Sequence, residues 1–141
     1  MGSRTKARKA AVDLLFEADQ REVNVRDLLA ARLAGTGGSV APREYTVEVV
    51  EGVVDHWTTI NEALTTYSLG WTLERMPAVD RAVLRLAAYE ILFRDDVADA
   101  VAIAEAVRLV TELSTAQSPA FVNGLLGRIA EIKPTIVESA G

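Results

Sequence analysis

The stretch that decides the fold is Asp80–Glu90, which reads DRAVLRLAAYE. Its apolar residues recur at intervals of three and four, which is the spacing of one face of an α-helix. Arg81 and Arg85 fall together on one side of that helix, whereas Val83 and Leu86 fall on another. The stretch therefore predicts a helix with an apolar face directed towards a core.

Helical periodicity extends from this stretch along the whole chain, and no run shows convincing strand alternation. Capping residues, prolines and glycines divide the chain into about seven helices. We expect them at residues 4–20, 24–33, 42–56, 58–70, 78–94, 99–113 and 118–132, with Lys133-Pro134 ending the last. The predicted fold class is all-α.

The length of 141 residues suits one domain with its own core. The clearest loop is Gly35–Pro42 (GTGGSVAP), with three glycines and a proline. It separates N-terminal helices at about 4–34 from a C-terminal helical group at about 43–133. We expect a single domain over residues 1–141, with this loop inside it.

Composition argues against an enzyme. The chain has no cysteine and one histidine, which excludes thiol catalysis, zinc fingers and a multi-histidine metal site within one chain. Asp55 and His56 are neighbours, which point about 100° apart on a helix and so form no oriented catalytic pair. The Gly35–Pro42 loop lacks the Gly-Lys-Ser/Thr of a phosphate-binding loop. We predict no catalytic residues, no metal and no cofactor.

No apolar run approaches the ~20 residues that cross a membrane. Asp13, Glu17 and Asp19 interrupt the apolar stretch that a signal peptide needs. These features predict a cytoplasmic protein without a membrane partner.

Charge is distributed unevenly. The first nine residues hold Arg4, Lys6, Arg8 and Lys9 and no acidic residue, so a total net charge of −5 leaves −9 on the rest. A basic arm on an acidic body confines polyanion binding to one patch.

The cations of the first helix share a sector with Val12 and Phe16, away from an apolar stripe of mostly alanine and leucine. Two interpretations remain open. Either Phe16 packs on another helix and the cations are merely solvated, or the face is composite, with cations for phosphates and an apolar step for a protein partner.

A glycine early in the last helix costs on the order of 1 kcal/mol. We interpret Gly124 as a point where a neighbouring helix approaches closely, with Asn123 satisfying its backbone. Trp57 and Trp71 are interpreted as packing residues and not as platforms for stacked bases.

Five stretches, in order and spacing, cover essentially the whole chain: residues 7–16, 71–77, 80–90, 101–107 and 118–124. Together they resemble the NusB family of bacterial transcription antitermination factors. The resemblance implies two small helical bundles packed together, in agreement with about seven helices. It also implies a non-enzymatic protein that binds the single-stranded boxA RNA of ribosomal RNA leaders together with NusE, a small-subunit ribosomal protein, in an antitermination complex with RNA polymerase.

The same resemblance implies site residues. Arg4, Lys6 and Arg8, extended by Lys9, stand in the family's RNA-contacting segment, and the loop residues Gln117 and Ser118 stand near the RNA. Thr5 replaces a usual basic residue, Ala104 an asparagine, and Gln117 an acidic residue whose charge would repel phosphate.

Phe16 and Asp80 stand at positions that the family associates with NusE. Two alternatives remain. One is a helical protein-interaction or ribosomal RNA maturation module, and a homodimer is compatible with it as well as with RNA binding. The other is a recognition domain related to that of ribosomal RNA methyltransferases. Because the chain shows no Gly-rich cofactor-binding unit, it would be at most the recognition part of such an enzyme.

Overall fold

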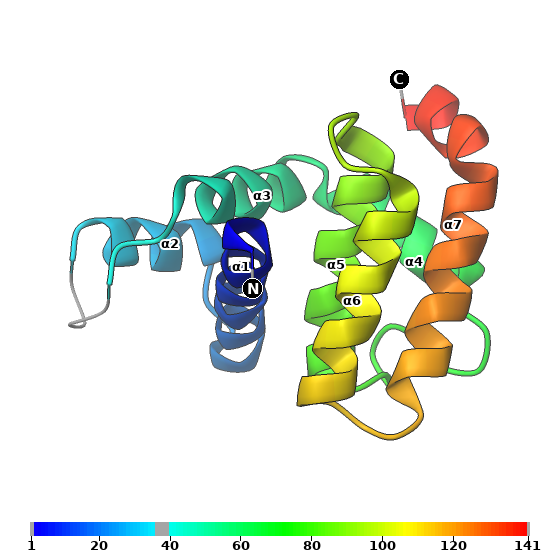
Figure 1. Ribbon diagram of the computed structural model, residues 1–141, viewed down its shortest axis with the longest axis horizontal. Coiled ribbons are helices and arrows are strands. Elements are labelled where there is room, and N and C mark those ends of the chain that lie inside the picture. Colours follow the sequence, from blue (N-terminus) through cyan, green and yellow to red (C-terminus); the bar gives the residue numbers. More distant parts are fainter. Residues whose placement is uncertain (1, 36–39, 141) are drawn as a thin grey trace.

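The computed structural model describes residues 2–35 and 40–140, and these form seven helices without a strand. The all-α class expected from the sequence is confirmed, and Figure 1 shows the arrangement. The helices are α1 (Ser3–Arg21), α2 (Val25–Leu33), α3 (Glu44–Asp55), α4 (Trp57–Tyr67), α5 (Ala78–Phe93), α6 (Asp99–Leu113) and α7 (Ser118–Ala140).

Several helix starts follow their sequence signals. The Asn24 side chain accepts a hydrogen bond from the backbone N–H of Arg26 at 2.8 Å and so caps α2. Pro77 is the N-cap of α5, as expected. Pro42, in contrast, is not the first residue of α3. Arg43, in extended conformation, is the N-cap, and the helix begins at Glu44.

The last helix is longer than predicted. α7 passes through Pro134 and continues to Ala140, although Lys133-Pro134 was expected to end it. A proline removes one hydrogen bond of the helix. Ile136, beyond the proline, packs against the core, and this contact favours continued helix.

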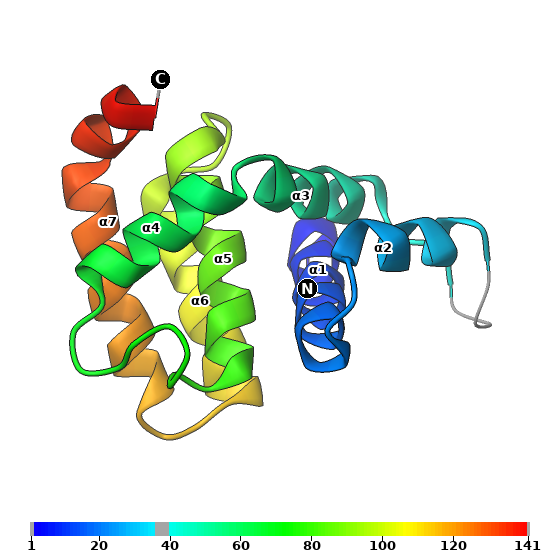
Figure 2. The same cartoon turned by 180° about the vertical axis from the view of Figure 1, so that it is seen from behind.

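The helices form two groups that share one hydrophobic core (Figures 1 and 2). α1, α2 and α3 pack on one another, and α4, α5, α6 and α7 form the second group. The division therefore falls at His56, between α3 and α4, and not at the 35–42 loop where the sequence placed it. Residues 36–39 of that loop lie outside the described residues.

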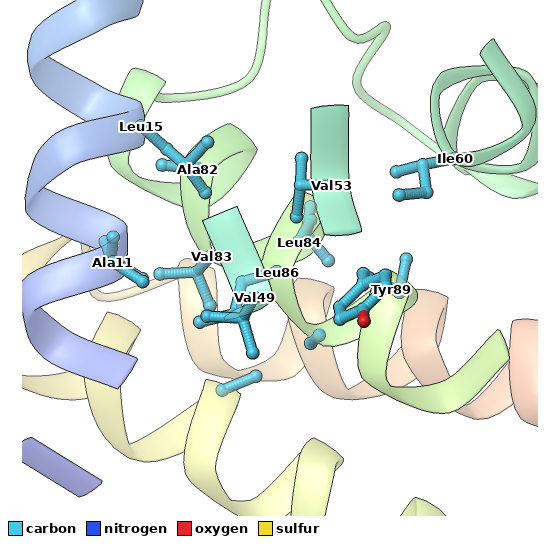
Figure 3. Close-up of a cluster of buried hydrophobic side chains, with 14 of the residues drawn as sticks. Ala11, Leu15, Val49, Val53, Ile60, Ala82, Val83, Leu84, Leu86 and Tyr89 are labelled. Atoms are coloured by element: carbon cyan, nitrogen blue, oxygen red, sulfur yellow. The ribbon is translucent and has the colours of Figure 1, made fainter. Parts of the chain in front are cut away.

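α5 is the central helix. It packs against α1, α3, α4, α6 and α7, and every residue from Ala82 to Leu92 is buried. Figure 3 shows Val83 of α5 beside Ala11 of α1 and Val49 of α3. The sequence predicted a helix with one apolar face, but a helix enclosed on all sides buries its charged residues too.

Two helices approach each other closely at Gly52 of α3. A Cβ atom at this position would lie 2.1 Å from Cζ of Tyr89 on α5. At Gly124, where the sequence suggested a close approach, a Cβ would meet only the Arg128 guanidinium, at 3.3 Å. Asn123 is exposed. The helix-contact role assigned to Gly124 is therefore wrong, and Gly52 has that role.

We expect Gly52→Ala to lower the free energy of unfolding by about 1–3 kcal/mol, because the new methyl group displaces the Tyr89 ring in a packed core. Gly127→Ala on α7 is the matched control, since nothing lies within 4 Å of its added Cβ. It should raise stability by about 0.5–1 kcal/mol through the helix preference for alanine. Urea unfolding measures both, and equal stability of Gly52→Ala and wild type would contradict the close approach.

Candidate nucleic-acid interface

The first turns of α1 place three cations at the surface. Arg4 forms an ion pair with Asp96 at 2.8 Å, and Lys9 forms one with Glu112 at 3.5 Å. The side chains of Arg4 and Lys9 are each 46% exposed. Lys6 is exposed and has no ion pair with any described residue. The basic segment is therefore partly neutralised by acidic residues at the two ends of α6.

Arg8 lies inside the protein, at 4% exposure. Its Nε donates to both carboxylate oxygens of Glu90, at 3.1 and 2.9 Å, and its Nη1 lies 3.9 Å from Glu105. Val12, one turn further along α1, is also buried. The sequence expected this sector to face solvent, but α1 packs it against α5, so the structure does not present Arg8 to an RNA strand.

Tyr45 of α3 lies among arginines. Its ring centroid is 4.2 Å from Cζ of Arg4, 5.0 Å from that of Arg94 and 5.6 Å from that of Arg8. Its hydroxyl donates a hydrogen bond to Glu90. Burial, and then this hydrogen bond, raise the pKa of the Tyr45 phenol, so the group stays a neutral donor. The Tyr45 ring therefore makes a cation–π contact with the guanidinium of Arg4.

Asp96 joins two of these arginines at the surface. It accepts hydrogen bonds from Arg94 at 3.0 and 2.9 Å and from Arg4 at 2.8 Å. The bonds from Arg94 and then from Arg4 hold the pKa of the Asp96 carboxyl well below its usual range. Because the Arg4–Asp96 pair is about half exposed, its net contribution to stability is small.

The two residues expected at the partner surface differ in exposure. Phe16 is half-buried at the edge of the core, so it packs on the protein and still offers part of its ring to solvent. Asp80 is fully buried, and neither of its carboxylate oxygens has a hydrogen-bond partner among the described residues. It occupies the first turn of α5, where the helix dipole favours a negative charge. The structure does not present Asp80 at the surface.

The two loop residues also differ. Gln117 is exposed between α6 and α7, whereas Ser118 is fully buried. The Ser118 hydroxyl accepts a hydrogen bond from the backbone N–H of Thr115 at 3.3 Å and donates one to the Ser114 hydroxyl at 3.1 Å. Ser118 therefore fixes the shape of the loop, and Gln117 is available at its surface.

Asp55 and His56 each have a partner of their own. Asp55 forms an ion pair with Arg26, and the His56 ring stacks on Phe93 at 3.7 Å between centroids. No group of three histidine or acidic side chains among residues 2–35 and 40–136 could hold a metal ion. In the same part of the chain, no helix is long and apolar enough to cross a membrane.

Sequence reasoning missed the residues that hold the basic segment in place: Tyr45, Glu90 and Asp96. One signal was available for Glu90, since an acidic residue inside an otherwise apolar helical run needs a buried cation as partner. Asp96 and Tyr45 carry no such signal, because their role depends on where α1 lies.

Comparison with known proteins agrees with the fold. A sequence model of the NusB family matches residues 5–131. A transcription antitermination protein NusB from Beutenbergia cavernae is 55% identical over 144 aligned positions, which cover 96% of this chain and 94% of that protein.

Solved structures give the same result. NusB of T. maritima has a TM-score of 0.78 at 31% identity, and the match covers 92% of each chain. A structure of antitermination factors NusB and NusE in complex with dsRNA has a TM-score of 0.77 at 24% identity, with 91% of this chain and 96% of that chain covered.

The fold and the matches over nearly the full chain define an all-α regulator of transcription of the NusB type. The chain belongs to the NusB family. It is accordingly a transcription antitermination factor and not an enzyme, as its sequence predicted.

We expect Arg8→Met to lower the free energy of unfolding by about 3–5 kcal/mol, because it leaves the Glu90 carboxylate buried without its cation. Arg4→Met, at an exposed pair, should change stability by no more than ~0.5 kcal/mol. The double variant Arg8→Met/Glu90→Gln should recover part of the loss. Urea unfolding of the three variants tests this, and equal stability of Arg8→Met and Arg4→Met would show that the buried pair is unimportant.

Proposed function

We propose that the protein binds single-stranded boxA RNA of ribosomal RNA leaders together with NusE, and acts in the cytoplasm within an antitermination complex with RNA polymerase. The observation that carries this proposal is the set of exposed cations Arg4, Lys6 and Lys9 on α1 of a NusB-family chain. The solved complex of NusB and NusE with dsRNA supports it by analogy.

Two of these cations, Arg4 and Lys9, are placed along α6. Arg4 pairs with Asp96, just before α6 begins, and Lys9 pairs with Glu112 in its last turn. The loop that carries Gln117 follows directly. An RNA strand along α1 would therefore meet Arg4, Lys6 and Lys9, with Gln117 near its end. Phosphate contacts hold such a strand, and its exposed bases supply the sequence preference.

Arg8 and Ser118 have supporting roles in this proposal. The buried pair of Arg8 with Glu90 fixes α1 on α5, and the hydroxyl of Ser118 fixes the loop beside Gln117. Arg8 and Ser118 thus influence RNA binding only by positioning the residues that contact the RNA.

The proposed NusE surface centres on Phe16, whose half-buried ring is already held by the core. Asp80 is fully buried and its carboxylate has no hydrogen-bond partner among the described residues, so its effect on a basic partner such as a ribosomal protein would act through its charge and not through contact. The chain has a net charge of −5, which attracts a basic partner. The same acidic surface repels RNA, so RNA binding is confined to the cations of α1.

We expect the triple variant Arg4→Gln/Lys6→Gln/Lys9→Gln to weaken binding of boxA RNA without loss of thermal stability, because all three side chains are exposed. With three phosphates neutralised, the log–log salt slope of wild type should be about −2.1, at about −0.7 per phosphate. A fourth contact, from Arg8, would steepen it to about −2.8. Fluorescence titration at several salt concentrations measures both quantities.

The control for this titration is Arg75→Gln, which removes an exposed cation without an ion pair among the described residues, from the link between α4 and α5. It should leave RNA affinity unchanged. Unchanged affinity of the triple variant would overturn the proposed site. A salt slope near zero would favour the protein-interaction module, and a loss of RNA binding at high protein concentration would indicate a homodimer that covers the site.

We expect Phe16→Ala to weaken the contribution of NusE while affinity for RNA alone stays the same, because Phe16 contacts the partner and not the strand. RNA titration with and without purified NusE separates the two effects. An equal effect of NusE on Phe16→Ala and wild type would exclude Phe16 from the partner surface.

A further inference from the structure

A pocket of about 530 Å³ lies where the two groups of helices meet. It is bounded by the end of α1, the start of α2, the end of α3, the start of α4 and the middle of α5, which can be followed in Figure 2. Apolar side chains form much of its wall: Leu15, Ala18, Val25, Val54 and Trp57. Its volume is in the range of small-molecule sites, which often lie between packed units.

Arg85 of α5 lines this pocket and is only 8% exposed. Its Nε donates to Oδ1 of Asn61 at 2.9 Å, and its Cζ lies 4.3 Å from the ring centroid of Trp57. Among the described residues, its two terminal amino groups have no hydrogen-bond acceptor and form no ion pair, and Asp19, which lines the same pocket, acts on the guanidinium only at longer range. Burial lowers the pKa of the Arg85 guanidinium to about 10.

The other arginines packed against or within α5 are different. Arg8 is held by Glu90, and Arg81 is held by Asp19 through hydrogen bonds at 2.6 and 3.1 Å. A buried cation without a counter-charge destabilises a fold, and an apolar side chain at the same place would serve packing better. Local violations of this kind are expected where a residue serves binding.

We propose that this pocket binds an apolar monocarboxylate, whose carboxylate accepts hydrogen bonds from the two terminal amino groups of Arg85 and whose apolar body lies against Trp57 and Val54. The planar guanidinium offers these groups as a pair, because its Nε is already engaged by Asn61. The proposed site shares no residue with the proposed RNA and NusE surfaces.

The charges of the pocket favour a carboxylate over a phosphate. Asp19 and Glu22 also line it, and Asp19 is already paired with Arg81. A doubly charged phosphate is repelled by these acidic residues more strongly than a single carboxylate is. The start of α2, with Val25 at the wall, adds the positive end of a helix dipole.

The test uses 2-naphthylacetate as probe and its neutral isostere 2-naphthylacetamide, followed by ¹H–¹⁵N NMR on the whole chain. We expect saturable shifts of the Trp57 indole and the Arg85 Nε–H with the acid, at millimolar affinity, and at least about tenfold weaker binding of the amide. The second of the two tryptophans, Trp71, packs against Phe121 and is an internal control that should not shift. Equal binding of acid and amide, or no shift at about 10 mM acid, would overturn the proposal.

Arg85→Met should weaken binding of the acid about tenfold while Tm stays equal to or above that of wild type, because an unpaired buried charge is replaced by an apolar chain. Arg75→Met, at the exposed link before α5, is the matched control and should bind the acid as wild type does. A lower Tm together with unchanged binding of the acid would show that Arg85 is structural, which overturns the proposal.

A second variant keeps Arg85 in place. Trp57→Ala removes a wall of the pocket at a side chain that is 41% exposed, so the fold should tolerate it. Both the acid and the amide should then bind more weakly than to wild type. Unchanged affinity for both would place the ligand elsewhere and overturn the proposed site.

Discussion

The enclosure of α5 on every side is the constraint on which the rest of the structure depends. A helix without a solvent face must have each of its charged groups met by a partner from a surrounding helix. Arg8 forms an ion pair with Glu90, and Tyr45 donates a hydrogen bond to the same carboxylate. Asp19 forms an ion pair with Arg81. These contacts link α1 and α3 to the central helix and so join the two groups of helices.

This constraint also shapes the candidate nucleic-acid interface. The pair with Glu90 turns Arg8 inward, whereas the neighbouring cations Arg4, Lys6 and Lys9 are exposed, and Arg4 and Lys9 pair with acidic residues just before and within α6. Their charge is not that of a free arm, since Asp96 and Glu112 neutralise two of them. Exposed pairs of this kind exchange partners at little cost, whereas the buried pair does not. The interface thus combines two exposed ion pairs, which can exchange partners, with a helix whose position the buried Arg8–Glu90 pair fixes.

Two charged groups on α5 lack such a partner. Among the described residues, Asp80 has no hydrogen-bond partner and Arg85 forms no ion pair. Asp80 is buried in the first turn of α5, and Arg85 lies in the pocket between the two groups of helices. The Arg85 exception coincides with a place where a ligand is proposed to bind, which gives a physical reason for a charge that the fold leaves without an ion pair.

The sequence by itself determined the all-α class, most helix boundaries, the absence of an enzyme's chemistry and the family resemblance, because caps, periodicity and residue types act over a few neighbours. Only the tertiary structure decided which sides of a helix are covered. A helical wheel of α1 places Arg8 and Val12 outside the apolar stripe, yet a partner 82 positions away along the chain, Glu90, draws that sector inward. The role of Gly52 depends in the same way on the ring of Tyr89, which no local pattern can locate.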